Sequence, residues 1–153
     1  MSPEGTIRVV RCPAVLRFVV LAFAALMLTM AVFAAGTSLF GSPSHQELST
    51  RMVGGSLPPR TLVSIWAFEA LGLLALFLAV EGRFRSPYLS GLIAGWLGWV
   101  FRGPLLVVTV VGALGQPSEP WFHRVVSWWL LYSLCGLVLG GLSRRLRADE
   151  AAL

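Results

Sequence analysis

Two charged residues stand inside long apolar stretches of this chain, and they are the residues best placed to do chemistry. Glu69 lies in the run from Thr61 to Val80, and Arg102 lies near the middle of the run from Tyr88 to Gly115. A charge in a lipid-embedded segment is costly and marks either structure or function. The two residues can form a structural ion pair. Alternatively, Arg102 can hold an anionic group, such as a lipid phosphate or a substrate carboxylate, with Glu69 as a proton-accepting neighbour.

Other reactive groups are sparse. His45 and His123 both fall on the predicted outer side, where we interpret them as polar residues at a wet interface; a shared haem or metal site is the alternative. Cys12 and Cys135 are far apart and form no C-x-x-C motif, so we expect no disulfide, no metal site and no thiol oxidoreductase activity. Phosphate-binding loops, zinc-protease motifs and a G-x-S-x-G elbow are absent from the sequence. We predict no catalytic residue and no cofactor.

The composition is that of a membrane protein. Of 153 residues, 56% are hydrophobic and only 12% are charged. A span needs about 20 apolar residues to cross about 30 Å of hydrocarbon, and four runs satisfy this. We predict an all-α integral membrane four-helix bundle, up-down-up-down, as a single domain over residues 1–153, with spans at about 14–36, 61–80, 88–114 and 120–142. Many small bacterial membrane families, DoxX-like proteins among them, share this layout. No motif in this sequence matches any of these families, so the shared layout implies no function.

The first span has a second interpretation, as a cleavable signal peptide ending near Ala34-Ala35-Gly36. Its apolar stretch exceeds the usual signal length of about 7 to 15 residues, which favours a retained anchor. The polar segment after this span contains Ser44-His45-Gln46-Glu47, a capping-box pattern, and Gly54-Gly55 as a stop. We therefore predict a short helix from about His45 to Val53 on the outer side.

The distribution of arginine predicts the orientation. All twelve basic residues are arginine, and the net charge is +5. One side of the predicted membrane has Arg8, Arg11, Arg17, Arg83, Arg85, Arg144, Arg145 and Arg147, and the other has Arg51, Arg60 and Arg124. The positive-inside rule then puts both termini in the cytoplasm of what we expect to be a bacterial inner membrane. Nucleic acid is excluded as a partner because the arginines are scattered over helix ends and form no continuous stripe.

Small and polar residues recur at alternating spacings of four and three, which predicts the faces that pack against protein. The predicted faces are Ile65, Glu69, Gly72, Leu76 and Ala79 in the second span; Gly91, Gly95, Gly98, Arg102, Leu105, Thr109 and Gly112 in the third; and Val126, Trp129, Ser133, Gly136, Gly140 and Ser143 in the fourth. Trp96 and Phe101 would point to lipid. Two G-x-x-x-G pairs, one in each of the last two spans, predict close contact between the inner ends of those helices. Pro104 is expected to loosen the helix near Arg102.

The short link between the second and third spans makes them an antiparallel hairpin. Measured from that link at roughly 1.5 Å per residue, Glu69 lies about 17 Å up and Arg102 about 21 Å up. Side chains lean toward the N-terminus of their own helix, so these two lean toward each other. The sequence therefore predicts that Glu69 and Arg102 meet.

Three functions fit these features. The favoured one is a structural or accessory membrane subunit that lies in the lipid bilayer and can associate with other membrane proteins or with copies of itself. The second is an oligomeric proton-coupled carrier or channel protomer that uses Glu69. The third is a membrane enzyme or redox component that binds a lipid-soluble molecule near Arg102.

Overall fold

A computed structural model describes residues 12–40, 58–115 and 119–151, and in these ranges the regular structure is entirely helical. The helices are α1 (Cys12–Phe40), α3 (Pro59–Val80), α4 (Pro87–Arg102), α5 (Pro104–Leu114) and α6 (Glu119–Ala151). Within the described residues, four stretches are long and apolar enough to cross a membrane, with α4 and α5 together forming the third. The short helix predicted from His45 to Val53 lies outside the described residues.

Proline and glycine set most of the helix boundaries. Proline stands at the start of α3, α4 and α5, where its missing N–H costs no hydrogen bond. Gly82, in the link after α3, and Gly115, at the end of α5, have φ angles of 86° and 60°, which glycine adopts without strain. At the other end of the chain, α6 continues past the predicted end at Leu142 to Ala151.

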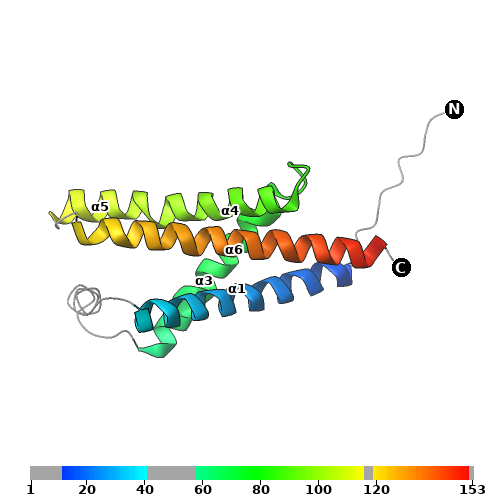
Figure 1. Ribbon diagram of the computed structural model, residues 1–153, viewed down its shortest axis with the longest axis horizontal. Coiled ribbons are helices and arrows are strands. Elements are labelled where there is room, and N and C mark those ends of the chain that lie inside the picture. The colour runs from blue at the N-terminus through cyan, green and yellow to red at the C-terminus, as the bar shows by residue number, and fades with distance from the viewer. Residues whose placement is uncertain (1–11, 41–57, 116–118, 152–153) are drawn as a thin grey trace.

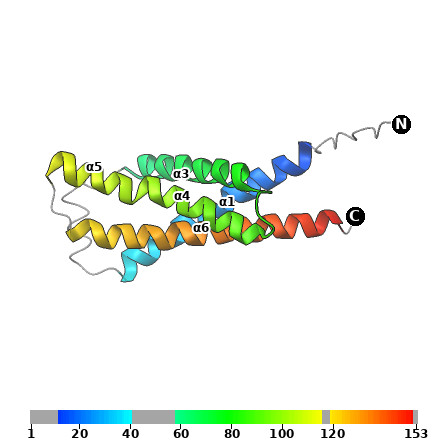
Figure 2. The same cartoon turned by 90° about the horizontal axis from the view of Figure 1, so that it is seen from above.

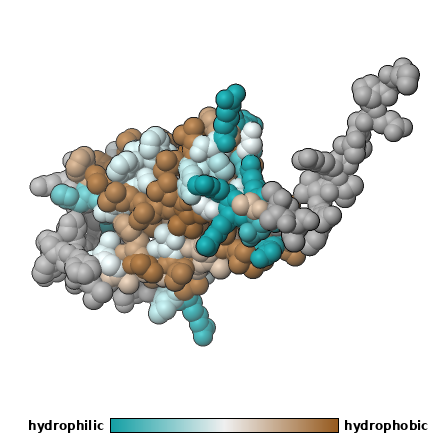
Figure 3. Space-filling view, turned by 45° about the vertical axis from the view of Figure 1, so that its right-hand side comes forward, coloured by the Kyte–Doolittle hydropathy of each residue, from teal (hydrophilic) through white to brown (hydrophobic). Residues whose placement is uncertain are grey.

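Helix α6 organises the bundle. Its most extensive contacts are with α4 and its next most extensive are with α1, whereas α3 packs mainly on α4 and α1. Figures 1 and 2 show that the beginning of α1, the link between α3 and α4, and the end of α6 all lie at one end of the molecule. In the face drawn in Figure 3, apolar residues cover the middle and hydrophilic residues gather toward that end.

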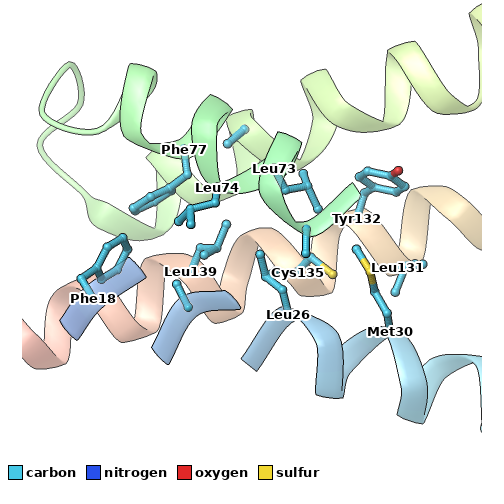
Figure 4. Close-up of a cluster of buried hydrophobic side chains, with 13 residues drawn as sticks. Phe18, Leu26, Met30, Leu73, Leu74, Phe77, Leu131, Tyr132, Cys135 and Leu139 are labelled. Carbon is cyan, nitrogen blue, oxygen red and sulfur yellow. The ribbon is translucent and has the colours of Figure 1, made fainter. Parts of the chain in front are cut away.

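The apolar core lies where α1, α3 and α6 meet (Figure 4). Every fourth residue of α1 is buried there, namely Phe18, Ala22, Leu26 and Met30. The Phe18 ring packs on that of Phe77 with centroids 5.8 Å apart, which places the beginning of α1 beside the end of α3. Many other apolar side chains are exposed on the outside of the bundle, as expected when the surroundings are lipid.

Helices α4 and α6 meet through a glycine interface made of Gly91, Gly95, Gly136 and Gly140. A Cβ atom added to any of the four would lie within 3.0 Å of a backbone atom of the facing helix, a separation that real side chains essentially never show. Gly91 faces Gly136, whereas Gly140 faces Pro87, so the two helices run antiparallel. The structure thus shows the close backbone approach that the two G-x-x-x-G pairs predict.

Parts of the predicted packing faces are wrong. In α3, Gly72 and Ala79 are exposed, and the buried residues are Ala70, Leu73, Leu74 and Phe77. The helix is turned by about one residue from the prediction because large apolar side chains, rather than small ones, fill the core on this side. Leu105, Thr109 and Gly112 of α5 are also exposed, as are Val126 and Trp129 near the start of α6. These residues belong to the end of the bundle that packs least, since α5 makes few contacts with other helices.

Candidate functional site

A break in the third span sets the position of Arg102. Helix α4 ends at Arg102, Gly103 adopts φ −91° and ψ −91°, and α5 begins at Pro104. The Gly103 N–H donates to the Trp99 carbonyl at 2.6 Å, which is the last regular hydrogen bond of α4. Pro104 has no N–H to donate the next one, so the helix is interrupted here. Arg102 is therefore in the last turn of a helix, where the partial negative charge of the helix end favours a cation.

Glu69 and Arg102 form an ion pair. The Arg102 Nη2 atom lies 2.9 Å from the Glu69 Oε1 atom, and the two side chains are 38% and 17% exposed. The guanidinium also lies over the ring of Trp128, 5.2 Å from its centroid, in a cation–π contact. The carboxylate, guanidinium and indole come from α3, α4 and α6, so these two contacts of Arg102 tie three helices together.

Tyr132 completes the surroundings of the carboxylate. Its ring is buried, and its hydroxyl interacts with the Glu69 side chain. A Cβ atom on Gly98 would lie 2.9 Å from Cε1 of Tyr132 and 2.8 Å from Cδ2 of Leu73. Gly98, predicted as a helix-packing residue, thus makes room for the tyrosine ring instead of contacting backbone. The missing side chain lets Tyr132 reach Glu69.

A second positive charge lies near the pair. Arg124 is one helical turn before Trp128 on α6, and its charge repels that of Arg102. Its guanidinium carbon is 5.9 Å from the centroid of the Trp121 ring. Together, Glu69, Arg102, Arg124, Trp128 and Tyr132 form what we call the charge cluster. With two arginines and one carboxylate, the charge cluster has a formal charge of +1 when all three are ionised.

Sequence reasoning found Glu69 and Arg102 but missed the three residues from α6. A signal for them exists, because Arg124, Trp128 and Tyr132 are spaced by four and share a helix face. The predicted packing face of this helix passes through Val126 and Trp129 instead. It therefore leaves out Trp128 and Tyr132, the aromatic side chains beside the ion pair.

Two tryptophans fix α4 against α6 beside the charge cluster. Trp99 Nε1 donates to the Val125 carbonyl at 2.9 Å, and Trp96 Nε1 donates to Ser133 Oγ at 3.1 Å. Trp96 is 47% exposed, so its ring faces outward as predicted while its N–H remains bonded within the bundle. Ser133 thus accepts a hydrogen bond that joins α4 to α6. Such bonds matter in lipid because water cannot replace a lost partner.

The remaining candidate residues lie away from the charge cluster or outside the described part of the chain. His45, half of the site that the alternative shares with His123, lies outside the described residues. The ring of His123 packs edge-on to that of Phe122. Cys135 is buried in the apolar core. Among the described residues, no three His, Cys, Asp or Glu side chains lie close enough together to hold a metal ion.

A second polar contact, missed at the level of sequence, lies at the end of the bundle that contains the link between α3 and α4 and the end of α6. The carboxylate of Glu81, just after α3, accepts hydrogen bonds from the hydroxyl of Ser143 and from Nη2 of Arg147, the latter at 2.8 Å. Since both partners are on α6, the contact joins the end of α3 to α6. Such a half-exposed pair stabilises a fold by about 1 kcal/mol or less.

No protein-family model matches this chain, and no curated protein or solved structure shows significant similarity to it. The four apolar helices fit a small membrane protein. The charge cluster is its most elaborate polar arrangement among the described residues, and it can do one of two things: hold helices together or present a guanidinium to an anion.

Proposed function

We propose that this protein is a structural or accessory subunit in a membrane, and that Glu69 and Arg102 are a structural ion pair. The observation that carries the proposal is the 2.9 Å contact between them. Three groups of the protein itself compensate the positive charge of the Arg102 guanidinium. They are the Glu69 carboxylate, the Trp128 ring and the C-terminal end of α4. A charge compensated in this way stabilises a fold in lipid without requiring a ligand.

The outer face of α3 supports the role of a subunit. Gly72, Ala75 and Ala79 are exposed on it, and a Cβ atom on Gly72 would meet no atom within 4 Å among the described residues. In lipid, small residues let helices approach closely, whereas a helix that contacts only lipid has no need of them. The open face of α3 therefore suits a further membrane helix, from another protein or from a second copy.

Gentle native purification tests the proposed function. The proposal predicts a protein partner, or a defined oligomer, that remains bound to the double variant Glu69→Gln/Arg102→Leu and is lost from Gly72→Leu. The double variant removes the charges but leaves the open face, whereas Gly72→Leu blocks that face where a side chain has space. Monomeric wild-type protein would argue against a subunit role, and so would proton-dependent uptake in vesicles that disappears in Glu69→Gln.

A second function is favoured by a specific observation, the positive charge of the cluster. Arg102 is 38% exposed and has Arg124 nearby. The charge cluster therefore carries more positive charge than the Glu69 carboxylate neutralises. In this alternative, Arg102 holds an anionic headgroup or carboxylate, and Trp128 packs against it. An anionic or quinone-like molecule that copurifies with wild type but not with Arg102→Leu would favour this function over the first.

For the orientation, we propose that the four spans alternate across the membrane with both termini in the cytoplasm. The end of the bundle that contains the start of α1 and the end of α6 also carries Arg17, Arg83, Arg85, Arg144 and Arg145. Arginine-rich loops remain on the cytoplasmic side during insertion. A reporter fused after Leu153 is therefore expected to be active only in a cytoplasmic form, and activity of a periplasmic reporter at that position would contradict the orientation.

A further inference from the structure

A groove lies at the arginine-rich end of the bundle, away from the charge cluster. It has a volume of about 500 Å³, and its lining includes Tyr88 from α4 and Val138, Gly141, Leu142, Arg144 and Arg145 from α6. Val138, Gly141 and Arg145 occupy successive turns of one face of α6. Along this face the groove therefore changes from apolar, toward the middle of the span, to cationic at the end of the span.

The two arginines of the groove have no ion pair within the part of the chain that the structure describes, whereas nearby Arg147 is paired with Glu81. Both Arg144 and Arg145 are exposed. The guanidinium carbon of Arg144 lies 5.8 Å from the centroid of the Tyr88 ring, which holds this side chain over the groove. The mouth of the groove thus presents two arginines that no described carboxylate pairs with.

The hollow depends on a glycine. A Cβ atom on Gly141 would be 3.6 Å from Cε1 of Tyr88, an ordinary contact, so the absent side chain is not required for α4 and α6 to pack. This distinguishes Gly141 from neighbouring Gly140, where a Cβ atom would lie 2.7 Å from the Pro87 carbonyl oxygen. Gly141 leaves space beside Val138 and Leu142 that an apolar chain of modest width can fill.

We propose that this groove binds an anionic phospholipid. The phosphate would lie between Arg144 and Arg145, whose guanidinium groups suit phosphate geometry, and an acyl chain would run over Gly141 along Val138 and Leu142. Basic pockets between membrane helices, at the level of the headgroups, are a recurrent way to bind anionic lipids. The inference requires only that the helices span a membrane, and it is independent of a subunit role.

Native mass spectrometry of the full chain in mixed micelles tests the proposal. Phosphatidylglycerol is compared with phosphatidylcholine of the same acyl chains, and the number and retention of bound lipids are measured. Wild type should retain one phosphatidylglycerol in preference to phosphatidylcholine. Arg144→Gln/Arg145→Gln should weaken this retention by up to about 30-fold. Each arginine near the headgroups contributes a factor of roughly five, and the two factors multiply. Gly141→Leu, which keeps every charge, should also weaken it because the side chain fills the hollow.

The matched control is Arg83→Gln/Arg85→Gln, which removes the same charge from the same end of the molecule without touching the groove. It should change retention much less than Arg144→Gln/Arg145→Gln does, because Arg83 and Arg85 do not line the groove. Equal losses from the two double variants would show general attraction to basic residues and overturn the proposal. Full retention by Gly141→Leu would overturn it as well, and so would displacement of the lipid by glycerol phosphate, which has no acyl chain.

Discussion

Gly91→Ala and Gly95→Ala are each expected to destabilise the folded protein by roughly 1 to 3 kcal/mol or more, the usual cost of forcing extra atoms into a packed interface. The first added methyl would meet the carbonyl of Gly136, and the second that of Tyr132. Backbone cannot move aside as a flexible side chain can, so α4 and α6 would have to separate. Reversible unfolding in mixed detergent micelles measures the loss.

The matched controls are Gly36→Ala in α1 and Gly112→Ala in α5, where an added methyl would meet no described atom within 4 Å. Glycine inside a helix is less favourable than alanine by about 1 kcal/mol. These two variants are therefore expected to be neutral or slightly more stable than wild type. If the interface variants are no less stable than the controls, α4 and α6 do not touch through their glycines.

The glycine interface could be predicted because its physical cause is visible in the sequence. Only glycine lets two backbones approach this closely, and Gly91, Gly95, Gly136 and Gly140 are paired at a spacing of four. The four long helices could be predicted for a similar reason, since length and hydropathy alone determine whether a helix can cross a bilayer.

The buried face of α3 could not be predicted in the same way. In water, the buried face of a helix is apolar and the exposed face is polar, but in lipid both faces are apolar. Leu73 and Phe77 face the core, and Leu71 and Leu78 face outward, although nothing in their chemistry separates them. The positions of small residues do not identify the buried face of α3 either, since Gly72 lies on its exposed face.

The charge cluster could be predicted in part. Glu69 and Arg102 are conspicuous because charges are rare in apolar spans, and helical rise placed them at similar depth. Their aromatic surroundings depend on how α6 is rotated against α4, which the glycine interface fixes. Arg102 also lies at a helix end, because the helix is interrupted at Gly103. The sequence predicts only a loosened helix around Pro104.

Glu69→Gln and Arg102→Leu are each expected to destabilise the protein strongly. Removing one partner of a buried ion pair typically costs about 3 to 5 kcal/mol, because the other charge is left uncompensated. We expect the lower part of that range for Glu69→Gln, since Arg102 retains its contact with the Trp128 ring. Arg102→Leu should cost at least as much as Glu69→Gln, because it leaves a carboxylate in an apolar setting, whereas Glu69→Gln leaves a guanidinium that can still reach the polar surface.

The structural ion pair is tested most directly by the coupling free energy between Glu69 and Arg102, obtained from the unfolding of wild type, the two single variants and Glu69→Gln/Arg102→Leu in one micelle composition. A structural pair predicts that the double variant recovers much of the loss, with a coupling of about 2 to 3 kcal/mol, near the upper end for residues in contact. Glu81→Gln combined with Arg102→Leu is the control, and its effects should add because Glu81 pairs with Arg147. If the effects of Glu69→Gln and Arg102→Leu also add, the pair does not hold the helices together and the central claim is wrong.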